Sequence, residues 1–110
     1  MIKLVALVRR KAGMDPADFR DCRLDVHAPL AAAIPGMRSD RINIARAPAD
    51  KPAAPCDGSA DIRFDDRAGM AAGHVSAQGA IGGDDTAQFA ERVEFPVTEE
   101  HVIPPAGAAR

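Results

Sequence analysis

The chain has 110 residues, about the size of a single domain, and 46% of them are hydrophobic and 27% charged. Its net charge is only −2, and no basic stripe alternates with aromatic residues, which argues against nucleic-acid binding. No apolar run approaches the length of a membrane span.

The two cysteines, Cys22 and Cys56, lie far apart and match no metal-binding or redox spacing. We expect them to be free thiols in a reducing compartment. The apolar N-terminus is too short for a signal peptide and runs into Arg9 and Arg10 without a cleavage site. The sequence therefore predicts a cytoplasmic protein.

Residues 2–10 (IKLVALVRR) form a short, mostly apolar run that predicts a strand. Alternate residues from Ile2 to Val8 point to one face, and Val5 and Leu7 point to the other. Because the middle of this strand is apolar on both faces, we expect both faces of its sheet to be covered.

A helix is predicted to begin at Pro16, with Asp15 as its cap. Apolar residues then recur at helical spacing, at Phe19, Cys22, Val26, Leu30 and Ala33. Pro29 lies within this helix and should leave the carbonyl of Asp25 without its usual partner, which favours a bend. Pro35 and Gly36 are expected to end the helix.

Two further strands are predicted by alternation, over residues 37–47 and 58–65, with a proline-rich surface loop at 48–57 between them. In the first of these strands Ile42 and Ile44 share one face, and Arg41 and Asn43 share the other.

The last third of the chain has weaker patterns. We expect a short helix over residues 67–78, a break at the glycines of 79–83, and a second short helix from Asp84 to about Val93. Residues 95–103 predict the last strand. The folded domain would then span residues 1–103, with 104–110 as a flexible tail.

This order, β-α-β-β-α-β, is typical of a ferredoxin-like α+β fold, in which the helices cover one face of a four-stranded antiparallel sheet. The other face stays open, yet Val5 and Leu7 place apolar side chains on it. The chain has no further layer to cover that face, so the sequence predicts a homodimer packed sheet to sheet.

Four segments in this order resemble the EthD family: IKLVALVRRKAGMDPADFRD, DVHAPLAAAIPGMR, DGSADIRFDD and VTEEHVI. The resemblance implies a ferredoxin-like fold, a homodimer with facing sheets (a dimeric α+β barrel) and a cavity between sheet and helices. It implies no single activity, because relatives include lactone isomerases and polyketide cyclases.

His27 is the principal candidate for catalysis. It lies beside the apolar stripe of the helix, at the edge of the helix–sheet contact, where a cavity could open. Its imidazole could move a proton near neutral pH, which suits isomerisation, enolisation or ring closure. The resemblance supports this role, since the histidine of the segment HAPL is the position usually suspected of function. Alternatively, its ring nitrogens only tie the helix end to nearby backbone.

Four other polar residues are binding candidates: Arg41, Asp61, Arg63 and His101. The first three could line a ligand cavity or form salt bridges across the dimer, and the dimer is favoured. Glu99 and His101 can converge on one strand face, but two ligands without a third make a weak metal site, and a structural or interface role is favoured for His101. No metal site is therefore predicted. No motif for a nucleotide, flavin, haem or phosphate appears either, so no cofactor is predicted.

The sequence thus favours a cofactor-free isomerase, cyclase or lyase that acts on a cyclic or carbonyl-bearing small molecule, with His27 as proton shuttle. The alternative is a non-catalytic protein that binds a hydrophobic or aromatic small molecule, or that assists a degradative or biosynthetic pathway. A third possibility is a dimer whose cavity is filled by its own side chains.

Overall fold

The computed structural model describes residues 1–46 and 56–107. Its helical elements are α1 (Pro16–Asp21), the π-helix η1 (Cys22–His27), α2 (Ala28–Ala32), α3 (Arg67–Val75) and α4 (Ala77–Thr86). Its strands are β1 (Ile2–Arg10), β2 (Met37–Ile44), β3 (Gly58–Phe64), β4 (Ala90–Glu94) and β5 (Val97–Glu99).

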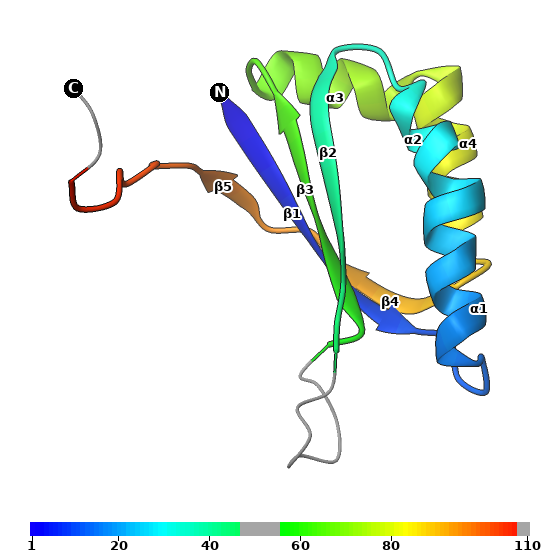
Figure 1. Ribbon diagram of the computed structural model, residues 1–110. Coiled ribbons are helices and arrows are strands. Elements are labelled where there is room, and N and C mark those ends of the chain that lie inside the picture. The colour runs from blue at the N-terminus through cyan, green and yellow to red at the C-terminus, as the bar shows by residue number, and fades with distance from the viewer. Residues whose placement is uncertain (47–55, 108–110) are drawn as a thin grey trace.

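Strand β1 is central, and the sheet order is β2-β3-β1-β4, with β5 also paired to β1. Every pairing is antiparallel. The helices cover one face of this sheet and leave the other open (Figure 1). The expected α+β architecture is confirmed. Among the described residues, no helix is long and apolar enough to cross a membrane.

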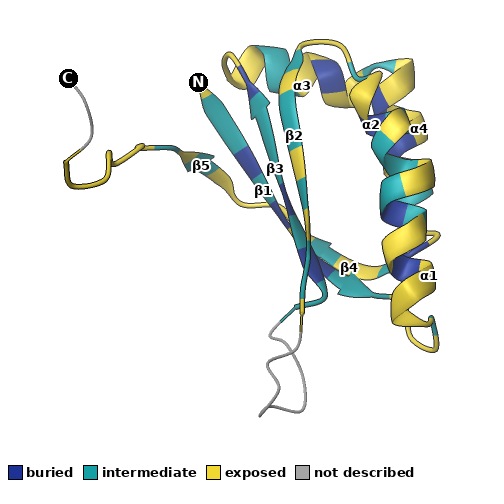
Figure 2. Ribbon diagram, viewed as in Figure 1, coloured by how far each residue is buried: buried dark blue, intermediate teal, exposed yellow. Residues whose placement is uncertain are grey.

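The core lies between the sheet and the helices (Figure 2). Leu4, Ala6 and Val8 of β1 are buried, as the predicted alternation requires, and they face the helical layer. Phe19 from α1 and Phe89 meet edge to face above them, with ring centroids 6.0 Å apart. Small residues on the strands leave the room that these rings fill.

The first helical segment begins as predicted, because the Asp15 carboxylate accepts a hydrogen bond from the amide of Ala17 at 2.8 Å. It runs from Pro16 to Ala32 without interruption, and its π-helical part ends at His27, two residues before Pro29. Gly36, at φ 81°, then turns the chain into β2.

The predicted break at 79–83 is wrong, because these residues lie inside α4. The helix is interrupted instead at Ser76, which separates α3 from α4. The Ser76 hydroxyl accepts a hydrogen bond from the amide of Gly79 at 3.0 Å. A side chain on Gly79 would overlap the carbonyls of Gly73 and His74. The glycine therefore lets α4 pack against the end of α3.

The predicted helix from Asp84 to about Val93 and the predicted strand over 95–103 are also wrong in their bounds. Helix α4 ends at Thr86, and the edge strand already starts at Ala90. Strands β4 and β5 both pair with the edge of β1 that β3 leaves free. The backbone groups of residues 90–94 and 97–99 thereby find hydrogen-bond partners on β1, which they would not have in a helix. The interruption falls at Pro96, which has no amide hydrogen, although its carbonyl accepts from Val5 at 3.0 Å.

Residues 100–103 lie outside any strand. The loop predicted at 48–57 lies mostly outside the described residues, and so does the end of the tail predicted at 104–110. The domain boundary at residue 103 stays a prediction. Cys22 and Cys56 are free cysteines.

Candidate active site

One face of the long helical segment points three side chains toward the sheet. Phe19, Arg23 and His27 follow one another at steps of four residues, which keeps them on a common face. The amide of Ala28 donates to the carbonyl of Arg23, five residues earlier, so the helix widens at this point. Such π-turns are frequent at functional sites.

His27 is held by a carboxylate from another helix. Its Nδ1 lies 3.0 Å from Oδ2 of Asp85 on α4, and the two side chains are only 20% and 13% exposed. Its ring also meets Phe89 edge to face, with centroids 5.1 Å apart. With Nδ1 donating to a carboxylate, a neutral imidazole carries its lone pair on Nε2. That nitrogen is then free to act as a base.

A cavity of about 50 Å³ lies between the helices and the sheet, and His27 lines it. The rest of its wall is mostly apolar, and the small residues Ala6 and Ala60 lie on its sheet side. The full lining besides His27 is Ala6, Val8, Arg23, Asp40, Ile42, Ala60, Ile62, Thr86, Phe89, Val93 and Phe95. Phe95 is 51% exposed, so the wall reaches solvent there. The volume suffices for several atoms, and is smaller than the ~150 Å³ of a cavity that holds benzene.

Arg23 is the most deeply buried charged residue of the described chain, at 2% exposed. Its guanidinium donates to the carbonyls of Asn43 at 2.9 Å and Ser59 at 2.8 Å, and burial lowers its pKa. A side chain on Gly58 would overlap the Arg23 guanidinium, so glycine is required there. Nε of Arg23 has no hydrogen-bond partner among the described residues.

Asp40 on β2 contributes a second buried polar group to the cavity. It pairs with Ile62 in the register of β2 and β3, which places it on the helix-covered face. Burial raises its pKa, and His27 and Arg23 oppose that shift while Asp61 adds to it. Oδ1 of Asp40 is buried and has no partner in the part of the chain that the structure describes.

The sequence signature of the EthD domain matches residues 11–92, well over half of the chain. This protein belongs to the EthD family. No functionally curated protein matches its sequence.

Solved structures share the fold of this EthD-family chain. An ethyl tert-butyl ether d (EthD) family protein from Bacillus halodurans is 24% identical, with a TM-score of 0.79 over 92% of this chain and 99% of that one. A dimeric protein of unknown function and ferredoxin-like fold from Bacteroides fragilis is 13% identical, with a TM-score of 0.68 over 90% and 95%. SnoaB, a cofactor-independent oxygenase from Streptomyces nogalater, is 14% identical, with a TM-score of 0.69 over 94% and 96%. The predicted ferredoxin-like fold is confirmed.

The four binding candidates of the sequence do not line this cavity. Arg41, Asp61 and Arg63 point to the open face of the sheet, opposite to Asp40 and Ile62. His101 follows β5 and is exposed, with its Nε2 3.1 Å from Oε2 of Glu99. No group of three metal-ligating side chains forms anywhere in residues 1–46 and 56–107.

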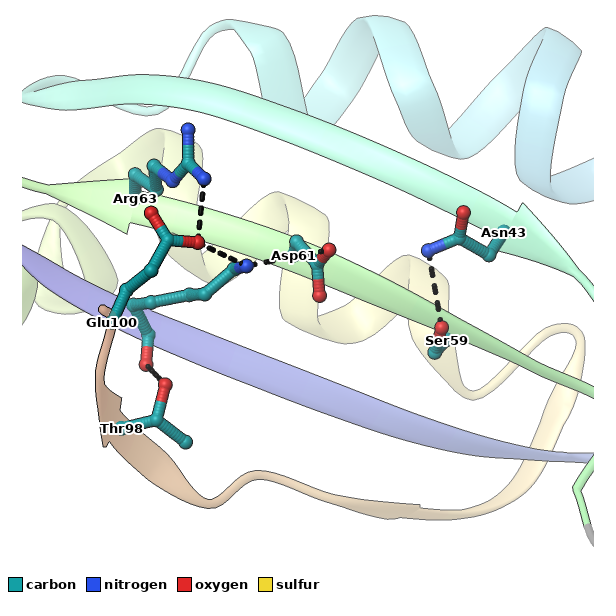
Figure 3. Close-up of polar contacts among 7 residues, drawn as sticks. Asn43, Ser59, Asp61, Arg63, Thr98 and Glu100 are labelled. Atoms are coloured by element: carbon teal, nitrogen blue, oxygen red, sulfur yellow. Dashed lines mark hydrogen bonds and ion pairs between the residues drawn. The ribbon is translucent and has the colours of Figure 1, made fainter. Parts of the chain in front are cut away.

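On the open face, Asp61 and Arg63 belong to an ion-pair cluster with Lys3 and Glu100 (Figure 3). Lys3 Nζ lies 2.5 Å from Glu100 and 3.6 Å from Asp61, and Arg63 donates to Glu100 at 2.6 Å. These charges pair within one chain.

Sequence reasoning missed three residues of the cavity region: Arg23, Asp40 and Asp85. Two of them had a usable signal. Arg23 shares the helix face of His27, and Asp40 has the same strand parity as Ile42. Asp85 lies 58 residues from His27 in the sequence, and only the packing of α4 brings the two together.

Proposed function

We propose that this EthD-family protein is a cofactor-free enzyme that moves protons on a small carbonyl compound, with His27 as the base. The observation that carries the proposal is the His27–Asp85 pair, whose imidazole lines an otherwise largely apolar cavity. A carboxylate on Nδ1 fixes the ring, selects the tautomer with a basic Nε2, and stabilises the imidazolium that forms.

The cavity limits what can react. About 50 Å³ holds a carbonyl group and the carbon beside it, but not a whole ring of benzene size. The remainder of a larger substrate would extend past Phe95, where the wall is exposed. The low polarity of the wall strengthens the electrostatic interactions of any group that enters. A neighbour of the same fold is described as a cofactor-independent oxygenase, which is compatible with chemistry that needs no cofactor.

A direct test is deuterium uptake by the carbon next to a carbonyl. Acetone, cyclopentanone and α-angelica lactone are incubated with the protein in D₂O, and loss of the proton signal is followed by NMR. We expect wild type to accelerate exchange on at least one probe. His27→Gln should lose about 10²–10⁴-fold of that rate, the usual contribution of a general base.

Asp85→Asn tests the positioning role of the carboxylate and should slow exchange at least about tenfold. Asp84→Asn is the matched control, because Asp84 is the exposed neighbour on the same helix. If wild type exchanges none of the probes, or if His27→Gln exchanges as fast as wild type, the enzyme proposal is wrong. Binding of a probe without exchange would favour the non-catalytic alternative.

We further propose that the protein is a cytoplasmic homodimer that packs through the open face of the sheet. Val5 and the 40% exposed Leu7 are apolar side chains on that face. A structural neighbour is described as dimeric, and the free thiols of Cys22 and Cys56 fit a reducing compartment.

A further inference from the structure

Two buried polar atoms of the cavity residues lack protein partners within the described chain, namely Oδ1 of Asp40 and Nε of Arg23. Such atoms are rare in folded proteins, because leaving a polar group buried and unpaired is costly. Asp40 lies on β2, and Arg23 and His27 lie on η1. Figure 1 shows the helical layer on one face of the sheet. A base and two unpaired polar atoms therefore belong to residues lining one cavity.

Asp40 has no partner for its buried Oδ1 among the described residues, although three ionisable groups influence its pKa. The pKa of Asp40 is affected by His27 and Arg23 from the helical layer and by Asp61 from the neighbouring strand. Asp85 in turn contacts His27 Nδ1. Burial outweighs the two favourable partners and raises the pKa of Asp40. Its carboxyl group thus keeps its proton to a higher pH than an exposed aspartic acid would.

We propose that Asp40 is the acid that works opposite His27, donating its carboxyl proton to the carbonyl oxygen of the substrate. The inference rests on the proposed function and narrows its substrate class to enolisable ketones and lactones. An acid and a base held on the residues of one cavity can act on the two ends of an enolisable group.

The proton balance of the step is complete without a further reactant. His27 Nε2 takes a proton from the carbon beside the carbonyl, and the electrons of that C–H bond form a C=C bond. The C=O π electrons take the proton of Asp40, which gives an enol, an imidazolium and a carboxylate. In D₂O the imidazolium exchanges the abstracted proton for a deuteron of the solvent before the reverse transfer. The reverse transfer then delivers that deuteron from His27 to the same or a conjugated carbon and returns the enol proton to Asp40, which gives exchange in the first case and isomerisation in the second.

The protonation of Asp40 is tested directly on the wild-type chain by a ¹³C NMR titration of the aspartate carboxyl groups. Asp40→Glu, which removes one aspartate resonance, provides the assignment. We expect Asp40 to titrate above the exposed aspartates of the chain. A titration among them, within the ordinary range of about 3.5 ± 1.2, would overturn the inference.

The catalytic role is tested by deuterium exchange with the same three probes. Asp40→Asn keeps the shape but cannot give up a proton, so exchange should fall about 10²-fold or more. The pH profile of the remaining rate should lose one of its two limbs. Asp21→Asn, an exposed change on α1, is the control and should match wild type.

The outcomes separate the two proposals. If His27→Gln abolishes exchange while Asp40→Asn leaves its rate and pH profile intact, the enzyme proposal stands and the role of Asp40 is refuted. If wild type catalyses no exchange, both fall. Asp40→Asn should fold normally, as judged by circular dichroism, because it removes a buried ionisable group without changing its volume.

Discussion

Glu100, which directly follows β5, forms ion pairs with residues on the open face of the sheet. Its carboxylate receives hydrogen bonds from Lys3 and Arg63, which lie on β1 and β3 (Figure 3). These two hydrogen bonds lower the pKa of Glu100 from 4.5 to about 2. The cluster is partly exposed, so salt screens it.

This shift predicts a pH-dependent stability. Because the pKa of Glu100 is lower in the folded than in the unfolded chain, its contribution is complete above about pH 4.5 and is lost as the pH falls toward 2. The Tm of Glu100→Gln should therefore lie below that of wild type at neutral pH, and the difference should shrink across this window. Thermal melts from pH 7 to about 2, at low and high salt, measure it.

Glu91→Gln, an exposed change on β4, provides the control for loss of one charge. A Glu100→Gln difference that stays constant with pH would show that the ion pairs with Lys3 and Arg63 do not stabilise the folded chain.

The sequence could place a residue in the candidate site only where the periodicity of one helix or strand determines which face its side chain occupies. The helical pattern of the sequence predicted His27 beside the apolar stripe, and the structure has it lining the cavity. The parity of β2 could have added Asp40. The pairing of His27 with Asp85 was not predictable, because it depends on where α4 packs. The sequence did not predict α4 itself, because its glycines have a low helix propensity.

Helix α4 illustrates how tertiary packing overrides local propensity. It contains Gly79, Gly82 and Gly83, and glycine costs about 1 kcal/mol against alanine in a helix interior. Gly79 nevertheless allows contact with the carbonyls of Gly73 and His74. Packing against α3 and the Ser76 cap together offset the weak propensity.

Two alanine substitutions in α4 should therefore have opposite effects. Gly83 is exposed, and a methyl group added there would meet nothing within 4 Å, so Gly83→Ala should stabilise the chain by about 0.5–1 kcal/mol. Gly79→Ala forces a methyl group onto backbone carbonyls and should destabilise it by about 1–3 kcal/mol. Urea unfolding of both variants gives the comparison. Equal stabilisation by both would mean that α4 does not pack closely on α3.

The strands and the first helix were predictable because their signals are local and agree with one another. Strand β1 has the predicted bounds, and β3 ends within one residue of the prediction. The edge strand was not predictable in the same way, because its charged and apolar residues alternate weakly. Its pairing is determined by the free edge of β1 and by Pro96, and both act at long range.

At the scale of the whole molecule, the two faces of the sheet serve different purposes. The helix-covered face supplies the floor of the cavity. The open face carries the Glu100 cluster at one end of β1 and Leu7 toward the other. Catalysis and the proposed dimer contact should therefore be separable by mutation.

Leu7→Asp is the change that separates them. A symmetric dimer uses the same patch twice, so one substitution removes two leucines that the proposed dimer would bury and inserts two charges. Losing about 1.5–3 kcal/mol of hydrophobic stabilisation at each copy should weaken dimerisation by about 10²-fold or more.

Sedimentation velocity over a concentration series measures the strength of dimerisation. Val75→Asp is the control, because Val75 is 85% exposed on α3. Wild type and Val75→Asp should sediment as dimers and Leu7→Asp as a monomer that retains deuterium exchange. A monomeric wild type, or a Leu7→Asp variant as dimeric as wild type, would contradict packing through the open face.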